Sequence, residues 1–169
     1  MYWLLTSLFL TADPMWIEKI YVAPPTVHRP ILTEYQPYIN SLLVATVSSN
    51  TQRVKKSNRA QKTIVMDKHT VEATMDTTCD YNKPLYCANE NQHWVMITDI
   101  FTTSDFATIV IKLYDENTDL IASISSPTYS LEKCPLQIKE KFCVTLEPKI
   151  LARDIHQAVT IMFDSIPPE

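Results

Sequence analysis

The chain contains no glycine among its 169 residues. At an average usage of about 7%, a chain of this length lacks glycine by chance only roughly a few times in a million. Glycine supplies positive φ angles and lets the backbone approach a ligand closely. Its absence therefore excludes the P-loop, the dinucleotide fingerprint, the G-x-S-x-G elbow and the EF-hand in their standard forms. Turns must depend on Asn, Asp, Ser and Pro, and we expect few tight two-residue hairpins.

Long apolar runs are absent as well. The apolar stretch from Tyr2 to Leu10 is far shorter than the ~20 residues that span a bilayer, and no later stretch approaches that length. Hydrophobic residues make up 46% and charged residues 20% of the chain, which is typical of a globular protein. We therefore expect one domain with a buried core and no transmembrane segment.

The four cysteines lack the close C-x2-C spacing of zinc sites and redox couples. Seven residues separate the first pair and eight the second, and no histidine pair has the H-x3-H spacing of a metal ligand set. The sequence predicts two disulfides, with local pairing as the simplest of three connectivities, between Cys79 and Cys87 and between Cys134 and Cys143. A four-thiolate site assembled in space and four buried thiols are the alternatives, and we expect no cofactor or metal.

The first cysteine pair encloses the segment CDYNKPLYC, residues 79–87. If a disulfide closes it, the segment forms a rigid loop that displays two aromatic rings and a proline. Such a loop is a candidate contact surface for a partner, through Tyr81, Pro84 and Tyr86.

The N-terminal segment MYWLLTSLFLTADP resembles an export signal, with an apolar run followed by Ala12 at the position before a cleavage site. Together with the cysteine pairs it predicts a signal peptide over residues 1–12 and a periplasmic or secreted protein. A buried first strand and a start codon placed downstream of the true one are the alternatives. If the segment is not an export signal, the alternative location of the protein is a virion or the inside of the cell.

Basic residues concentrate in one segment, RVKKSNRAQK, which has no acid. It holds five of the 15 basic residues, namely Arg53, Lys55, Lys56, Arg59 and Lys62. The rest of the chain therefore has ten basic residues against 19 acidic ones. Its polar composition predicts a solvated loop, and the alternative is contact with an anionic surface or acidic partner. No aromatic residue interleaves, so we expect no specific nucleic-acid binding.

Periodicity predicts mainly strands. Residues 13–40 hold five prolines and predict an extended N-terminal arm, followed by one β-rich domain over residues 41–169. SLLVATVSS (41–49) alternates as a strand, HWVMITDIF (93–101) is apolar on both faces as a central strand is, and TIVIKLYDENTDLIASIS predicts a hairpin. The C-terminal KILARDIHQAVTIMFDSI predicts an amphipathic helix, although AVTIMF alone also fits a strand.

These elements favour a mainly β, antiparallel β-sandwich-like domain with a C-terminal amphipathic helix and the proline-rich arm; a small α+β fold is the alternative. No catalytic constellation is evident. The pairs His69–Asp67, His93–Glu90 and His156–Asp154 have spacings that are common by chance. Asp115, Glu116 and Asp119 could bind calcium, but acidic residues are also common in turns, which accounts for them equally well.

No stretch is specific enough to name a family. The sequence predicts an exported, disulfide-stapled, non-enzymatic binding or assembly protein with a protein partner or self-association. The alternatives are a structural subunit of a virion, pilus or similar assembly, and an enzyme of unknown class.

Overall fold

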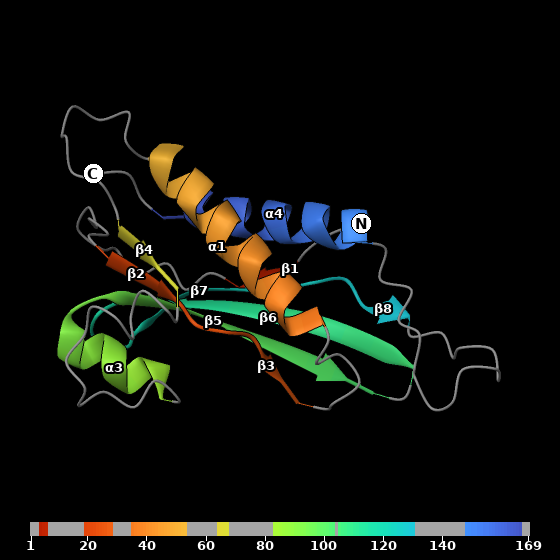
Figure 1. The fold of residues 1–169 in the computed structure, drawn as a ribbon, viewed down its shortest axis with the longest axis horizontal. Coiled ribbons are helices and arrows are strands. Elements are labelled where there is room, and N and C mark those ends of the chain that lie inside the picture. Colours follow the sequence, from red (N-terminus) through yellow and green to blue (C-terminus); the bar gives the residue numbers. More distant parts are fainter. Residues whose placement is uncertain are drawn as a thin grey trace.

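In a computed structural model, the chain folds around one mixed sheet (Figure 1). The structure describes residues 4–6, 19–28, 35–53, 64–67, 83–103, 105–130 and 148–166. The strands are β1 (Leu4–Thr6), β2 (Lys19–Val22), β3 (Thr26–Val27), β4 (Ile64–Met66), β5 (Trp94–Thr102), β6 (Phe106–Tyr114), β7 (Leu120–Ser125) and β8 (Tyr129–Ser130). The helices are α1 (Gln36–Arg53), α3 (Pro84–Asn91) and α4 (Pro148–Asp164).

The eight strands run in the order β1-β7-β6-β5-β2-β4, with β3 beside β5 and β8 beside β6. The pairs β1–β7, β7–β6 and β6–β5 are antiparallel, whereas β2 and β3 pair with β5, and β4 pairs with β2, in parallel. The parallel pairing of β2 with β4 needs a crossover, and α1 lies between them in the chain. All strands that the structure describes belong to one sheet, so the predicted sandwich is not confirmed, and the arrangement matches the mixed α and β alternative.

Helices α1 and α4 lie side by side on one face of the sheet (Figure 1). Their apolar side chains meet those of β2, β5, β6 and β7 in the main core, which includes Leu43 and Val47 from α1 and Ile155 and Val159 from α4. The predicted C-terminal helix is therefore confirmed, including the segment AVTIMF. Pro148 occupies the first position of α4, where its missing N–H has no intrahelical partner to lose.

The strand predicted over residues 41–49 is wrong, because this segment lies within α1. The buried residues Ile39, Leu43 and Val47 recur every four positions, and Ala45, which a strand would place beside Leu43 and Val47, is exposed. Apolar residues at nearly every position from Leu42 to Val47 satisfy both periods. Pro37 in the first turn and the absence of a later proline or glycine allow the helix to run for 18 residues.

The predicted extended arm is also wrong for the part that the structure describes. Strand β2 lies between β5 and β4, and Ile20, Tyr21 and Val22 are fully inaccessible to solvent. A strand covered on both faces is apolar throughout, so it shows no alternation for a sequence pattern to detect. Nearer the N-terminus, Leu4–Thr6 pairs with β7 as an edge strand, and removal of residues 1–12 stays a prediction.

The central strand and the hairpin are confirmed as β5, β6 and β7. The hairpin turn is built on Asp115, whose Oδ1 accepts hydrogen bonds from the N–H groups of Asn117 at 2.9 Å and Asp119 at 2.8 Å. In the part of the chain that the structure describes, two residues other than glycine take left-handed backbone angles, Thr118 in this turn (φ 68°) and Gln92 just after α3 (φ 53°). The buried Asp115 carboxylate thus shapes the turn.

Candidate functional site

The two faces of the sheet differ in what covers them. Along β5, Met96, Thr98 and Ile100 are buried on the side of α1 and α4, and the residues between them point to the opposite face. At one end of that opposite face, α3 contributes Leu85 to a smaller cluster with Tyr21 and Val95. Beyond this cluster Phe101 and Phe106 are exposed on this face, and Asp99, Val110 and Lys112 are partly exposed.

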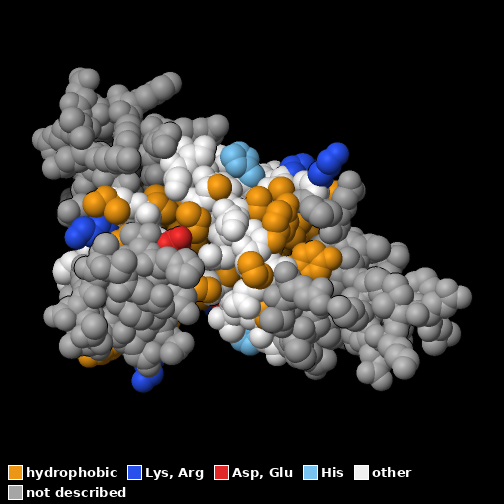
Figure 2. Space-filling model, viewed as in Figure 1, with side chains coloured by type: hydrophobic (Ala, Val, Ile, Leu, Met, Phe, Trp, Pro, Cys, Tyr) orange, Lys and Arg blue, Asp and Glu red, His pale blue; other side chains and the backbone are white. Residues whose placement is uncertain are grey.

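We call this accessible part the open sheet face. By strand alternation and register it is formed by His28, Asp99, Phe101, Phe106, Val110 and Lys112. Phe101 is 44% exposed and Phe106 is 49% exposed, which makes them two of the seven large hydrophobic residues exposed in the described part of the chain. Figure 2 shows that hydrophobic side chains also lie across the middle of the side drawn there.

Strand β3 sets the position of His28. Thr26 pairs with Asp99 and Val27 with Ile100, and the N–H of His28 donates to the carbonyl of Ile100 at 3.1 Å. This register puts the imidazole flat against the ring of Phe101, with ring centroids 4.4 Å apart and an angle of 4° between the planes. The pair presents a stacked aromatic unit on the open sheet face.

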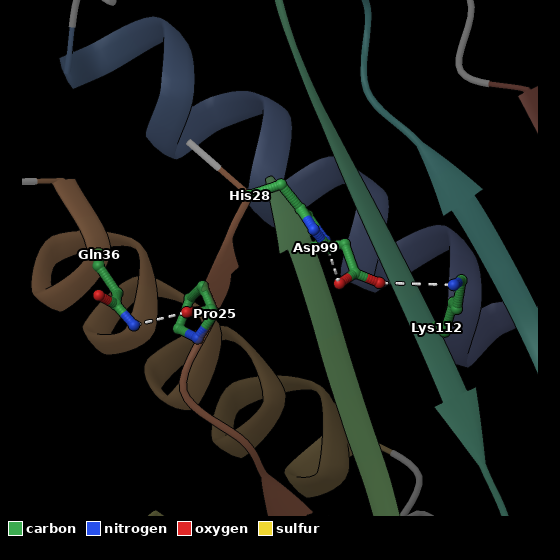
Figure 3. Close-up of polar contacts among 5 residues, drawn as sticks. All are labelled: Pro25, His28, Gln36, Asp99 and Lys112. Atoms are coloured by element: carbon green, nitrogen blue, oxygen red, sulfur yellow. Dashed lines mark hydrogen bonds and ion pairs between the residues drawn. The ribbon is translucent and has the colours of Figure 1, made fainter. Parts of the chain in front are cut away.

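The segment before β3 is tied to helix α1. The Gln36 side-chain amide donates to the carbonyl of Pro25 at 2.6 Å, from the first residue of α1 to the connection between β2 and β3 (Figure 3). This contact joins the layer of helices to the strand that carries His28. The position of His28 therefore depends on the pairing of β3 with β5 and on the start of α1.

The carboxylate of Asp99 lies between two basic groups (Figure 3). His28 Nε2 is 3.0 Å from Asp99 Oδ1, and Lys112 Nζ is 3.4 Å from Oδ2. The Asp99 side chain is 15% exposed, against 43% for His28 and 33% for Lys112. The open sheet face thus combines exposed aromatic rings with charges of both signs that already balance one another.

This composition suits recognition of a protein surface. Aromatic residues are enriched in the centres of protein interfaces, where their large rings bury area at little cost in conformational entropy. Among the residues that the structure describes, no three His, Cys, Asp or Glu side chains come together to hold a metal ion. In that same part of the chain, no helix combines the length and apolarity needed to cross a membrane.

The predicted contact loop over residues 79–87 is wrong in its second half. Pro84 is the first residue of α3, and Tyr86 and Cys87 lie within that helix. Proline is favoured at the first helical position, and Pro84 begins a helix where the sequence predicts a rigid loop. Tyr86 is nevertheless 54% exposed.

The remaining predicted contact and cysteine positions are mostly outside the described residues. Cys87 is fully buried and is not a free thiol. Arg53 is the last residue of α1. No structural statement applies to Tyr81, Cys79, Cys134, Cys143, Lys55, Lys56, Arg59 or Lys62, so their pairing and contacts stay predictions.

Asp154 and His156 lie in different surroundings on α4, as expected for a spacing that is common by chance. Asp154 is buried at 2% exposure, and His156 is exposed. Asp154 Oδ2 accepts a hydrogen bond from the Tyr129 hydroxyl at 2.9 Å, and its Oδ1 accepts from Arg153 Nη2 at 3.1 Å. Burial first, and the Asp154 carboxylate second, raise the pKa of Tyr129 above its usual value. The hydrogen bond between Tyr129 and Asp154 links β8 to α4.

The open sheet face was missed at the level of the sequence. Alternation along β5 and β6 places Asp99 with Phe101, and Val110 with Lys112, on one side of each strand. What it does not give is the register, which sets Val110 opposite Asp99, or the parallel pairing that brings His28 to Phe101.

No known protein family matches the chain, and no curated protein matches it. Among solved structures, a dodecamer of a point variant of PelC from Paraburkholderia phytofirmans has a TM-score of 0.52 at 9% identity, over 95% of this chain and 96% of that one. The fold resembles that of PelC.

Two further structures are less similar. The lipoprotein GNA1162 from Neisseria meningitidis has a TM-score of 0.43 at 13% identity, over 89% of this chain and 99% of that one. TolB from Acinetobacter baumannii has a TM-score of 0.33 at 14% identity, over 94% of this chain and 31% of that one. Of these three, the likeness to PelC alone is close enough to describe the fold.

Proposed function

We propose that the protein is an exported, non-enzymatic protein that binds other copies of the same chain. The observation that carries the proposal is the open sheet face, where Phe101 and Phe106 stay exposed beside the balanced charges of Asp99 and Lys112. Exposed aromatic side chains that share one face mark interaction sites on otherwise polar surfaces. The resemblance to PelC, which forms a dodecamer, supports assembly with copies of the same chain over binding of an unrelated protein.

Export is supported by the apolar segment before Ala12 and by the state of Cys87, which is not a free thiol. Export with cleavage after residue 12 would remove β1 and leave β7 as the edge of the sheet. The local pairing of Cys79 with Cys87 would close a short loop onto the start of α3, and in the chain-entropy model such a closure stabilises by roughly 2.5 kcal/mol.

Assembly is tested by the mass of the purified protein in solution. Light scattering coupled to size exclusion, over a hundredfold range of concentration, is expected to give a multiple of the mass of one chain. A mass of one chain at every concentration would overturn self-association and favour a monomeric binding module for another protein.

Export and the disulfides are tested by intact mass. The chain is expressed with its own N-terminus in an exporting host, and free thiols are alkylated before and after reduction. We expect loss of residues 1–12 and no alkylation until reduction. An uncleaved chain with four reactive thiols would contradict both export and the disulfides, and would favour an intracellular role.

A further inference from the structure

We infer that the open sheet face is the contact between two copies of this chain, related by a two-fold axis. The inference rests on the proposed self-association and adds the surface and the symmetry of the contact. Phe101 and Phe106 are each nearly half exposed, and His28 is stacked on Phe101. A second copy would cover these rings and remove their apolar area from water.

The outward side of α4 provides the contrast within the same molecule. Its exposed positions are mostly polar or charged, at Lys149, Arg153, His156, Gln157 and Asp164, and they also include Ile150. The open sheet face has two exposed phenylalanines, Phe101 and Phe106. Enrichment of aromatic residues is one feature that separates interface centres from ordinary surface.

The charges favour a second copy over a partner of one strong charge. Asp99 carries the acid of the face, and Lys112 and His28 carry its basic groups within 3.4 Å of it. A face with both signs can pair with a second copy, because a two-fold axis that passes between Asp99 and Lys112 sets the acid of each copy against the base of the other. Each carboxylate then keeps a basic partner when water is excluded, which avoids leaving a buried charge unpaired.

The shape of the face is compatible with this contact. Strands β5 and β6 are nine residues long and pair along their length. Two such sheets stack about 10 Å apart, a distance that side chains the size of phenylalanine fill. A two-fold contact between sheet faces would supply, between two chains, the sheet-on-sheet packing that the sequence predicts within one chain.

The experiment exchanges the charges between two variants. Asp99→Lys and Lys112→Glu are made separately, and the mass of each is measured alone and in an equal mixture, at a concentration where the unmodified protein is associated. Alone, each variant would place like charges across the axis, so we expect at least a tenfold weaker association. In the mixture both contacts become opposite in charge, and we expect the associated mass to return.

Folding is checked separately, because each change also breaks the pair within its own chain. Thermal unfolding followed by circular dichroism must show a cooperative transition in both variants. Phe101→Ser gives a second measure that leaves all charges in place, and Ile150→Ser is its control, since Ile150 is 39% exposed on α4, across the sheet. We expect the first to weaken association at least tenfold and the second to leave it unchanged.

The outcomes separate this inference from the proposed function. Unmodified protein of one-chain mass would overturn self-association itself. Unmodified protein that associates, with variants that associate equally well, would leave self-association standing and overturn the open sheet face as its site. Variants that dissociate alone and do not recover in the mixture would overturn the two-fold pairing of Asp99 with Lys112.

Discussion

The two faces of the sheet use the same strands for different purposes. On the face toward α1 and α4, side chains such as Ile111 are fully excluded from water and join one continuous core. On the other face, their neighbours along the same strand, such as Lys112, stay partly exposed and take part in a charge cluster. Because successive side chains of a strand point to opposite faces of the sheet, residues that stabilise the core alternate with residues available for recognition. Neighbouring residues on one strand can therefore have different roles.

The largest expected effect lies at the centre of the helix-covered face. Ile155 is fully buried in α4, and Ile155→Asp would place a charge there with no partner. We expect the free energy of unfolding to fall by about 4 kcal/mol. Urea unfolding measures the change, with Gln157→Asp on the exposed side of the helix as control. A near-normal midpoint for Ile155→Asp would contradict the packing of α4 on the sheet.

The polar contact at the margin of the same face should matter less. Tyr129→Phe removes the hydroxyl that donates to the buried Asp154 carboxylate, and we expect a loss of about 1 to 2 kcal/mol at pH 8. Urea unfolding at that pH is the measurement, and an unchanged midpoint would show that the hydroxyl does not stabilise α4.

The same residue predicts a dependence on pH. The pKa of Tyr129 is raised in the folded protein above its ordinary value of 10.0. Its contribution is therefore complete below pH 10 and is lost as the pH rises further, because the unfolded chain releases this proton first. We expect the difference in stability between the unmodified protein and Tyr129→Phe to shrink from pH 8 to pH 11. A constant difference would argue against the raised pKa.

The turn that joins β6 to β7 belongs to neither face, and substitution there should stabilise. Thr118 has a φ of 68°, which costs a β-branched residue more than it costs asparagine. Thr118→Asn is expected to raise the free energy of unfolding by about 0.5 to 1 kcal/mol, and Thr118→Val, which keeps the branched side chain, should not. Equal midpoints for the two variants would show that the turn stores no strain.

The smallest effect on folding is expected on the open sheet face. Lys112→Ala should change the free energy of unfolding by less than about 0.5 kcal/mol, because ion pairs accessible to water contribute little. Ile111→Ala, one residue earlier on the same strand, should cost about 3 kcal/mol. Unfolding of both variants under conditions where the protein is monomeric makes the comparison, and similar losses would refute the division between the two faces.

The elements that the sequence predicts well are those with one clear period over many residues. Strand β6 alternates from Ile109 to Tyr114, and α4 repeats apolar residues at helical spacing from Leu151 to Met162. The sequence predicts a strand in the middle turns of α1, because the adjacent apolar residues from Leu42 to Val47 fit both the helical and the strand period.

Strand β2 shows a different limit. Its residues Ile20 to Val22 are apolar without alternation, and the prolines that follow favour an exposed segment. Only the parallel pairing with β5 and β4, over residues far along the chain, buries this strand. The candidate site has the same origin, since His28 reaches Phe101 only through the parallel pairing of β3 with β5.

By itself, the sequence determined the class of the protein: a chain without glycine-dependent nucleotide sites or a long apolar span, with a β-hairpin and a terminal amphipathic helix. These properties depend on composition and on neighbours a few residues apart, which a linear pattern records. Tertiary structure alone decided that α1 covers one face, that β2 lies inside the sheet, and that His28, Asp99 and Lys112 meet on the other face. Those outcomes depend on the register between strands distant in the sequence, and register follows from the burial of the whole sheet rather than from any one strand.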